Sequence, residues 1–322
     1  IAEWWWKIGQ NSIWRRTSGS DTTFQTSDYR TTILCSLKVV SISGEVGSDE
    51  KRLFIKDVGG HLIVYSRGDI RNPYIHLNDS KFSEERYITR GFDPKFSPDG
   101  KYIVFHYVYN RQYYIYRMDW DGQNIRRLDA TNGGINPSWY SDSRHIAYAR
   151  IIDKRWRIYK INIDNANNRE IVNIERRHAE EPAVNPLNSD EIVFFSNERN
   201  DAFTRNIFFH NSSGDSQILP NNNYYRYNLE FYGANLLWNS NPRDNNAGRY
   251  LRIVNRAVPA NVIDLYHDNA YYLKGVFSKQ GNLVYYIRTG GNSTYLYQCN
   301  LDGTNDIELG YFNNSIIDFD VK

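Results

Sequence analysis

The chain has 322 residues and a formal net charge of +2, from 39 Lys and Arg against 37 Asp and Glu. This balance excludes a general nucleic-acid binder, which we expect to be strongly basic, and no apolar run of about 18 residues that could span a membrane occurs. Aromatic side chains make up 15% of the sequence, including 26 Tyr and 8 Trp, which suffices for a large core and for stacking surfaces.

The first 48 residues have the least regular pattern. The Trp4-Trp5-Trp6 run suits a strand, an inserted anchor or a tail packed against the rest, and residues 12–17 and 32–40 are better strand candidates. We expect residues 1–48 to supply strands to a β-domain that occupies residues 49–322, so that the whole chain is one domain. The Trp run is also a candidate contact for an assembly partner.

A hairpin recurs along the rest of the chain, and its best copy is Phe92–Phe105. It combines a short strand, a Pro-Asp-Gly turn and a strand of alternating apolar residues, and Asp99-Gly100 suits the tight reversal. The apolar centre of the second strand recurs at intervals of 40 to 47 residues. The six copies are Ile63–Tyr65, Ile103–Phe105, Ile146–Tyr148, Ile192–Phe194, Leu236–Trp238 and Leu283–Tyr285. This period, with several short strands per repeat, predicts an all-β fold, a β-propeller of four-stranded antiparallel blades.

The number of blades depends on the C-terminal strand. Six full repeats occupy residues 50–90, 92–130, 134–174, 180–219, 225–266 and 271–310, each split into strands A to D from axis to rim. The segment Ile316–Val321 repeats the A-strand pattern but has no downstream partner. Because an unpaired edge leaves backbone groups unsatisfied, we expect a seventh blade, with Ile316–Val321 as its inner strand and residues 1–48 as its outer strands. Six blades, with both ends of the chain packed outside, is the alternative.

These motifs resemble a known family. Phe96-Ser-Pro-Asp-Gly100, followed by Ile103–Phe105 and by Asp119-Trp-Asp-Gly122, is similar to the TolB-type repeat of WD40-like propellers. Pro137–Ser143 and Pro182–Asn188 are weaker copies, and the resemblance covers roughly residues 50–310. It implies the fold but not the activity, because such blades serve as scaffolds, receptors, peptidase gates and polysaccharide lyases. The α/β domain that precedes the propeller in TolB itself is not evident.

One end of the predicted blades is rich in Arg, Tyr and Asn. The B–C and D–A loops meet there, and the expected binding residues are Arg67, Arg71, Arg111, Arg155, Arg205, Arg249, Arg288, Tyr224, Tyr225, Tyr271 and Tyr311. Arg offers forked donors to carboxylate or sulfate, and Tyr stacks on flat apolar faces. We therefore expect recognition of an acidic glycan or an acidic protein partner. Simple solvation of polar loops is the alternative.

No motif of catalysis stands out, so the sequence favours a binding protein without cofactor or metal over an enzyme. Nucleophile, P-loop and dinucleotide motifs are absent, and the seven His are scattered over different repeats. His106 and His178, the latter beside Glu180 and Glu181, are expected to approach one face. Since propeller-type lyases use His, Tyr and Arg around acidic sugars, a polysaccharide lyase or hydrolase is the second alternative. The first alternative is a structural subunit of an extracellular or surface assembly.

Several features favour export to the extracellular space, the cell surface or the periplasm. The chain begins at Ile1 instead of Met, as after removal of a signal peptide or an expression leader. Cys35 and Cys299 come from segments that ring closure brings together, so we expect either a disulfide or two buried thiols. Sequons that are candidate glycosylation sites begin at Asn78, Asn211, Asn292 and Asn313.

Overall fold

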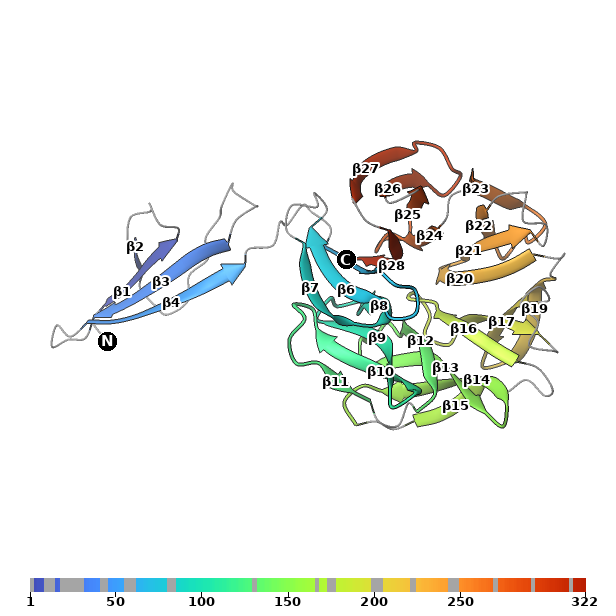
Figure 1. Cartoon of the computed structure of the whole chain (residues 1–322), viewed down its shortest axis with the longest axis horizontal. Coiled ribbons are helices and arrows are strands. Elements are labelled where there is room, and N and C mark those ends of the chain that lie inside the picture. Colours follow the sequence, from blue (N-terminus) through green and yellow to red (C-terminus); the bar gives the residue numbers. More distant parts are fainter. Residues whose placement is uncertain are drawn as a thin grey trace. The chain divides into compact units, whose positions relative to one another are not determined.

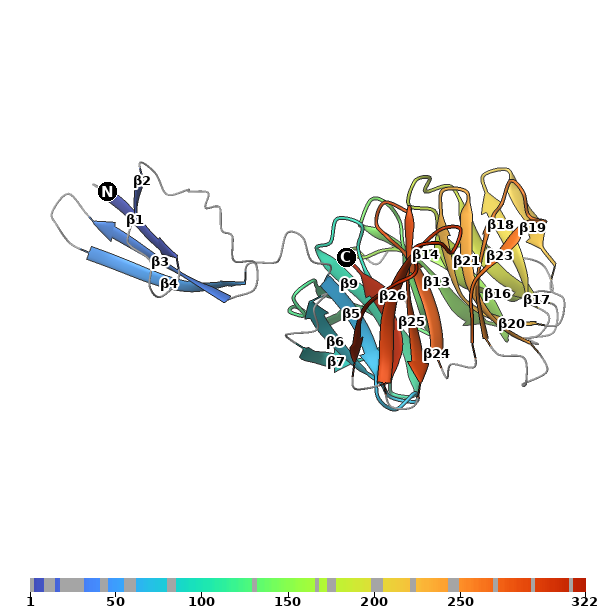
Figure 2. The same ribbon diagram turned by 90° about the horizontal axis from the view of Figure 1, so that it is seen from above.

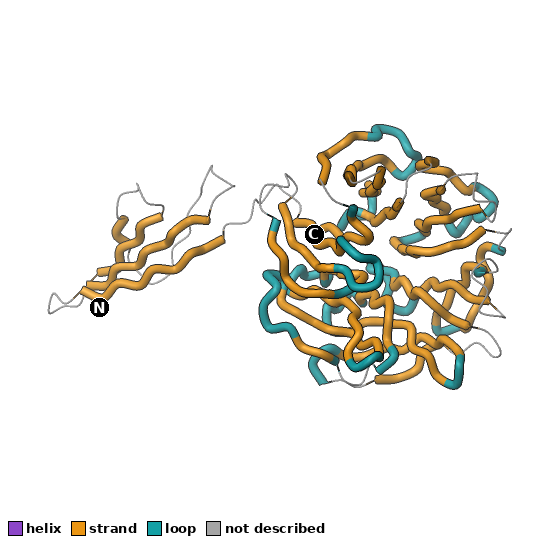
Figure 3. Tube along the Cα trace, viewed as in Figure 1, coloured by secondary structure: helices purple, strands orange, loops and turns teal. Residues whose placement is uncertain are grey.

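The computed structural model describes residues 3–8, 15–17, 32–40, 46–54, 62–79, 85–128, 132–165, 168–172, 178–197, 205–220, 224–242, 249–268, 272–290, 293–312 and 315–322. Every regular element in these ranges is a β-strand, as Figure 3 shows. No helix in these ranges is long and apolar enough to cross a membrane. The chain divides into two compact units, Ile1–His61 and Leu62–Lys322, and each is described by itself.

The first unit is one antiparallel sheet of four strands. They are β1 (Glu3–Ile8), β2 (Arg15–Thr17), β3 (Thr32–Val40) and β4 (Val46–Phe54), in the order β2-β1-β3-β4. The Trp run lies in β1, and the strand expected at 32–40 is β3. None of these strands pairs with a strand of the second unit among the described sheets, so they complete no propeller blade.

The second unit is a propeller of six four-stranded antiparallel blades, which Figure 1 shows around a common centre. From inner to outer strand, blade 1 is β28 (Ile316–Val321), β5 (Leu62–Arg67), β6 (Tyr74–Asp79) and β7 (Arg86–Arg90). Blade 2 is β8 (Phe92–Phe96), β9 (Tyr102–Tyr109), β10 (Gln112–Asp119) and β11 (Arg126–Arg127). Blade 3 is β12 (Gly134–Trp139), β13 (His145–Ile152), β14 (Arg155–Asn162) and β15 (Asn168–Val172).

The other three blades follow the same inner-to-outer order. Blade 4 is β16 (His178–Val184), β17 (Ile192–Asn197), β18 (Asn206–Asn211) and β19 (Gly214–Leu219). Blade 5 is β20 (Tyr224–Tyr232), β21 (Asn235–Pro242), β22 (Arg249–Asn255) and β23 (Val262–Asp268). Blade 6 is β24 (Tyr272–Phe277), β25 (Leu283–Gly290), β26 (Ser293–Asn300) and β27 (Ile307–Phe312).

The prediction of seven blades is wrong, because the C-terminal strand completes the first blade. β28 pairs with β5, with Phe319 opposite Tyr65 and Asp320 opposite Val64. The expected inner strand around Phe54 is instead β4 of the first unit, and blade 1 takes its inner strand from the other end of the chain. The ring therefore closes through Ile316–Val321 as expected, but its partner is Leu62–Arg67 and not a strand from residues 1–48.

The predicted apolar repeat forms the propeller core. All residues of the six second-strand triplets are buried except Leu283, which is half-buried. Their side chains pack between neighbouring blades: Val104 of blade 2 lies in one cluster with Trp139 and Tyr148 of blade 3. Each copy of the apolar triplet in the sequence therefore supplies the same kind of contact between neighbouring blades.

The strands of each blade run between two ends of the propeller, seen edge-on in Figure 2. The A–B and C–D connections share what we call the turn end, and the B–C and D–A connections share what we call the loop end. Turn-end carboxylates organise their own turns: Asp99 accepts a hydrogen bond from the backbone N–H of Lys101 at 3.0 Å, and Asp142 accepts one from Arg144 at 2.9 Å. Gly100 adopts a φ of +69°, which the tight turn requires.

Candidate binding site

The six inner strands surround a cavity of about 370 Å³ on the propeller axis. It opens at the turn end, where Pro98, Pro186 and Lys279 belong to A–B connections. Its volume lies in the range of small-ligand pockets, roughly 300–1,000 Å³. The cavity is therefore a candidate site in its own right.

Bulges in the inner strands place polar side chains along this cavity. Asp93, Asn136, Glu181 and Asn228 each sit at a register shift in the pairing with the next strand, with φ of 49°, 50°, 48° and 54°. Asp and Asn tolerate this left-handed conformation better than most residues, and a bulge re-aims the side chain it carries. The four residues come from four consecutive blades and all line the cavity.

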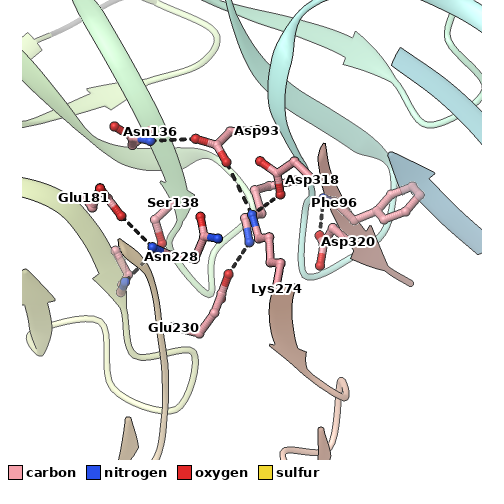
Figure 4. Close-up of polar contacts among 12 residues, drawn as sticks. Asp93, Phe96, Asn136, Ser138, Glu181, Asn228, Glu230, Lys274, Asp318 and Asp320 are labelled. Atoms are coloured by element: carbon pink, nitrogen blue, oxygen red, sulfur yellow. Dashed lines mark hydrogen bonds and ion pairs between the residues drawn. The ribbon is translucent and has the colours of Figure 1, made fainter. Parts of the chain in front are cut away.

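A buried cluster at the cavity joins four blades (Figure 4). The ammonium of Lys274 bonds Asp318 and lies 3.3 Å from Oδ1 of Asp93, whose Oδ2 accepts a hydrogen bond from Asn136 Nδ2 at 2.6 Å. Burial and the adjacent Asp93 carboxylate raise the pKa of Asp318 well above its usual value. For Asp93, burial is the largest effect and opposes ionisation, but Lys274 together with a hydrogen bond from Asp318 and the charges of His106 and Lys95 outweighs it and lowers the pKa. The two carboxyls thus share one ammonium, and Asp318 binds a proton more readily than Asp93.

A second ion pair crosses the cavity. Lys95 of β8 bonds Oε1 of Glu230 of β20, and these strands belong to blades 2 and 5, which stand opposite each other in the ring of six. Beside this pair, Asp320 accepts a hydrogen bond from the backbone N–H of Phe96 at 2.7 Å. Burial raises the pKa of Asp320 to about 6, because the effect of burial is larger than the opposite effect of the Lys95 charge.

The structure gives Arg205 a different position from the exposed loop expected for it. Its Nη1 donates to Glu181 at 2.8 Å and its Nη2 donates to Glu180 at 2.6 Å, with the Arg205 side chain only 12% exposed. The guanidinium also lies 5.5 Å from the ring centre of Tyr225, another expected binding residue. Arg205 and Tyr225 therefore belong to a buried network behind the cavity wall.

The remaining expected residues divide by exposure. Those exposed at the loop end are Arg71, Arg111, Arg155 and Tyr311. Those half-buried are Arg67, which pairs with Glu85 at 2.9 Å, together with Arg249, Arg288 and Tyr224. Arg288 lies 5.1 Å from the ring centre of Tyr266. Tyr271 is outside the described residues. The loop end thus presents part of the expected set, and the binding role of the whole set stays a prediction.

Sequence reasoning missed two groups of residues. At the loop end, Tyr74, Tyr109, Tyr113, Ile70 and Ile151 are exposed beside the arginines. Arg90 and Arg127 lie over the rings of Tyr74 and Tyr109, at 4.9 and 4.4 Å from the ring centres. In the cavity, we missed the polar residues of the inner-strand bulges. A recurring pattern in the sequence could have indicated them, namely an acid or amide directly before proline in Asp93-Pro94, Asn136-Pro137 and Glu181-Pro182.

His106 and His178, which we expected to approach one face, belong to blades 2 and 4. His106 lies 3.9 Å from Asp93 and stacks on Phe92, whereas His178, in blade 4, accepts a hydrogen bond from the backbone N–H of Trp156 at 3.3 Å. No three His, Cys, Asp or Glu side chains in the described ranges are placed to hold a metal ion.

Both cysteines and two of the four sequon asparagines lie in the described residues. Cys299 is a free, buried thiol of β26, and its expected pairing with Cys35 of β3 stays a prediction. Asn78 is 3% exposed in β6, and Asn211 is half-buried at the end of β18. Asn292 and Asn313 are outside the described residues, so glycosylation also stays a prediction.

Comparison with known proteins supports the fold alone. No protein-family model matches the sequence, and no curated protein matches it. Among solved structures, TolB from Acinetobacter baumannii shares 14% identity, covering 92% of this chain and 80% of that chain with a TM-score of 0.66. A nidogen/laminin complex shares 14% identity over 82% and 98%, with a TM-score of 0.60. An oligogalacturonate lyase in complex with manganese shares 11% over 78% and 73%, with a TM-score of 0.52. The chain is thus a β-propeller with TolB-like structural neighbours.

Proposed function

We propose that the chain is an exported, non-catalytic binding module that recognises an acidic partner through its loop end. The observation that carries this proposal is the clustering of exposed aromatic and aliphatic side chains with exposed arginines. Ile70, Tyr109, Ile151 and Tyr311 are 54%, 48%, 45% and 56% exposed, and Arg71, Arg111 and Arg155 are exposed beside them. The exposed apolar groups of the turn end, Leu187, Val258, Val262 and Ile307, are aliphatic, whereas the loop end combines exposed tyrosines with arginines, and exposed apolar groups rimmed by polar residues are typical of an interaction surface.

The chemistry of this end suits carboxylate or sulfate groups. Arg111 occupies a left-handed turn, with φ of 63°, between β9 and β10, so its side chain leaves the tip of a blade. Arg90 also donates to the Tyr74 hydroxyl at 3.2 Å while it lies over that ring. Stacked guanidinium groups bind carboxylate edges while the tyrosines supply stiff contact area.

A protein partner is favoured over a glycan by the breadth of the apolar component. Ile70 and Ile151 offer aliphatic surface that an acidic sugar cannot use fully, and interfaces between proteins bury such groups at their centre. A structural neighbour comes from a nidogen/laminin complex, so the fold is compatible with protein recognition. A subunit of an extracellular or surface assembly, anchored through Trp4–Trp6, remains the first alternative.

The experiment compares two double variants of equal charge change. Arg111→Ala with Arg155→Ala removes two exposed cations at the loop end, and Lys101→Ala with Arg144→Ala removes two at the turn end. Binding of poly-glutamate, polygalacturonate and neutral dextran is measured by biolayer interferometry. We expect the first variant to weaken acidic ligands by about fivefold to thirtyfold, from two exposed charge contacts of about 0.5–1 kcal/mol each, and the second to leave them unchanged. Equal losses in both variants, or equal binding of dextran, would refute the loop-end proposal.

A further inference from the structure

The cavity at the turn end has an apolar entrance and a charged interior. Its entrance is formed by Pro98, Trp139, Pro186, Tyr232 and Phe277 of five different blades. Deeper, Lys95, Glu230 and Asp320 line it at one level, and Asp93 and Lys274 line it further in. A ligand that enters must therefore pass apolar surface before it reaches charge.

The interior of the cavity holds fewer cations than carboxyls. Four carboxyls, Asp93, Glu230, Asp318 and Asp320, share the two ammonium groups of Lys95 and Lys274. Arg205 adds no uncompensated positive charge, because its guanidinium already pairs with both Glu180 and Glu181. Carboxyls without enough cations keep protons instead, and the raised pKa values of Asp318 and Asp320 agree with this.

We propose that the cavity binds an ammonium group on an aliphatic stem, with the ammonium between Glu230 and Asp320 and the stem along the apolar entrance. The Lys95 ammonium bonds Oε1 of Glu230, so the other oxygen of Glu230 can accept from a further donor. Asp320 interacts with the backbone N–H groups of Phe96 and Val321 and supplies a second carboxyl beside that position. Aliphatic stems of amines cover apolar surface while the charged head stays paired.

The same chemistry excludes an anionic ligand. Both interior lysines already bond carboxylates, so an added carboxylate or phosphate would meet more negative than positive charge. At the mouth, Lys279 and Lys322 also line the cavity, and Lys322 bonds the carbonyl of Gly100, so the surplus of carboxyls is confined to the interior. This cavity is therefore opposite in charge preference to the loop end and independent of the proposed function. The ammonium has two sources, a lysine side chain on an extended peptide or a free diamine.

Lys95 gives the site an internal competitor. Its ammonium already occupies one side of Glu230, and removal of that ammonium vacates room and negative charge for a ligand. Lys95→Met should therefore tighten amine binding, whereas loss of a merely structural lysine would weaken or abolish it. The direction of the change in amine affinity therefore distinguishes a binding site from a merely structural cluster.

The experiment titrates the whole chain with cadaverine, with a blocked Gly-Lys-Gly peptide and with glutarate by isothermal titration calorimetry. We expect saturable binding, one site per chain, for at least one of the two amines and none for glutarate. Glu230→Gln should weaken this binding about tenfold, the effect of one charge-assisted hydrogen bond of about 1.5 kcal/mol. Lys95→Met should tighten it severalfold, and Asp302→Asn, an exposed turn carboxyl of blade 6, should leave it unchanged.

Each outcome decides the proposal. Binding of cadaverine alone, or of the peptide alone, supports it and identifies the source of the amine. Absence of binding by both amines to folded wild-type chain overturns it, as does binding of glutarate. If Glu230→Gln does not fold, Lys95→Met still decides, because a weaker amine affinity in that variant contradicts the proposed competition.

Discussion

Lys95 and Glu230, 135 residues apart in sequence, form an ion pair across the axis of the propeller. Each projects from an inner strand, and the two strands belong to opposite blades. Lys274 makes a second connection, from blade 6 to Asp318 of blade 1 and Asp93 of blade 2. These contacts tie the inner strands to one another where the apolar contacts between blades end.

The first prediction concerns the energy of the crossing pair. Glu230→Gln should lower the free energy of unfolding by about 1–3 kcal/mol, because it leaves Lys95 with a neutral partner. Lys95→Met combined with Glu230→Leu should be neutral or stabilising, since two desolvated charges disappear together. Urea denaturation of Lys95→Met, Glu230→Leu and their double variant gives the coupling energy. A double variant as unstable as the sum of the singles would contradict a direct pair.

The second prediction concerns ring closure. Phe319 of β28 is fully buried between blades 1 and 6, so Phe319→Ala should cost about 3–5 kcal/mol in one cooperative transition. Deletion of Ile316–Lys322 should lower the melting temperature of the whole propeller, because β5 loses its inner partner. Removal of residues 1–61 is the matched control and should leave that transition in place, since all six blades lie in Leu62–Lys322. An unchanged melting temperature after the C-terminal deletion would contradict closure through β28.

The third prediction concerns pH. The pKa of Asp320 is raised from 3.8 to about 6 in the folded state, so the folded chain holds this proton more tightly than the unfolded chain. Its contribution is complete below about pH 4 and is lost as the pH rises through about 6. At about 1.4 kcal/mol per pKa unit the loss is at most about 3 kcal/mol.

Asp320→Asn isolates this contribution, because the amide can still accept the hydrogen bond from Phe96. The stability difference between the variant and wild type should grow in favour of the variant from about pH 4 to about pH 7. Urea denaturation at several pH values measures it. A difference that is independent of pH would show that Asp320 titrates normally.

Much of the fold was predictable because one contact repeats. Ile103 and Phe105 pack on one side of β9 and Val104 on the other, and the same apolar triplet in each repeat specifies the same inter-blade packing. The blade count was not predictable, because Phe54, near the start of the expected first repeat, fits the inner-strand pattern as well as Phe96 does. Which of two similar strands pairs with β5 depends on a contact between Ile316–Val321 and Leu62–Arg67, at opposite ends of the propeller sequence.

The candidate sites were predictable only in part. Arg111 and Arg155 lie in short turns, where loop position alone implies exposure. Arg205 also follows a loop, but its partners Glu180 and Glu181 belong to a different strand of the blade. The sequence around Arg205 therefore does not indicate that this side chain forms buried ion pairs. The charged residues of the cavity could not be found from the repeat, because equivalent positions of the inner strands carry different side chains in different blades.

The fourth prediction concerns salt. Exposed charge contacts are screened over about 8–10 Å at physiological ionic strength, so affinity of the loop end for poly-glutamate should fall as salt rises. The Arg111→Ala, Arg155→Ala double variant should show a shallower dependence on salt than wild type. Interferometry across a salt series measures both slopes. Binding that is indifferent to salt would assign recognition to the tyrosines and isoleucines instead of the arginines.

The fifth prediction separates two arginines that look alike in sequence. Arg205→Ala leaves Glu180 and Glu181 buried without their cation, and loss of one partner from a buried ion pair costs about 3–5 kcal/mol. Arg111→Ala changes an exposed turn residue and should alter stability by no more than about 0.5 kcal/mol. Ligand affinity should respond in the opposite order: Arg111→Ala weakens poly-glutamate binding, and Arg205→Ala leaves it unchanged wherever the variant is folded.

Arg205→Lys is the matched control for the buried position. A lysine keeps the charge but lacks the fork that donates to both carboxylates at once, so its stability should fall between wild type and Arg205→Ala. Urea denaturation and interferometry on the same three proteins provide the comparison. If Arg205→Ala were as stable as Arg111→Ala and bound acidic ligand less tightly, Arg205 would return to the recognition surface. The retained stability would also mean that Glu180 and Glu181 do not depend on it.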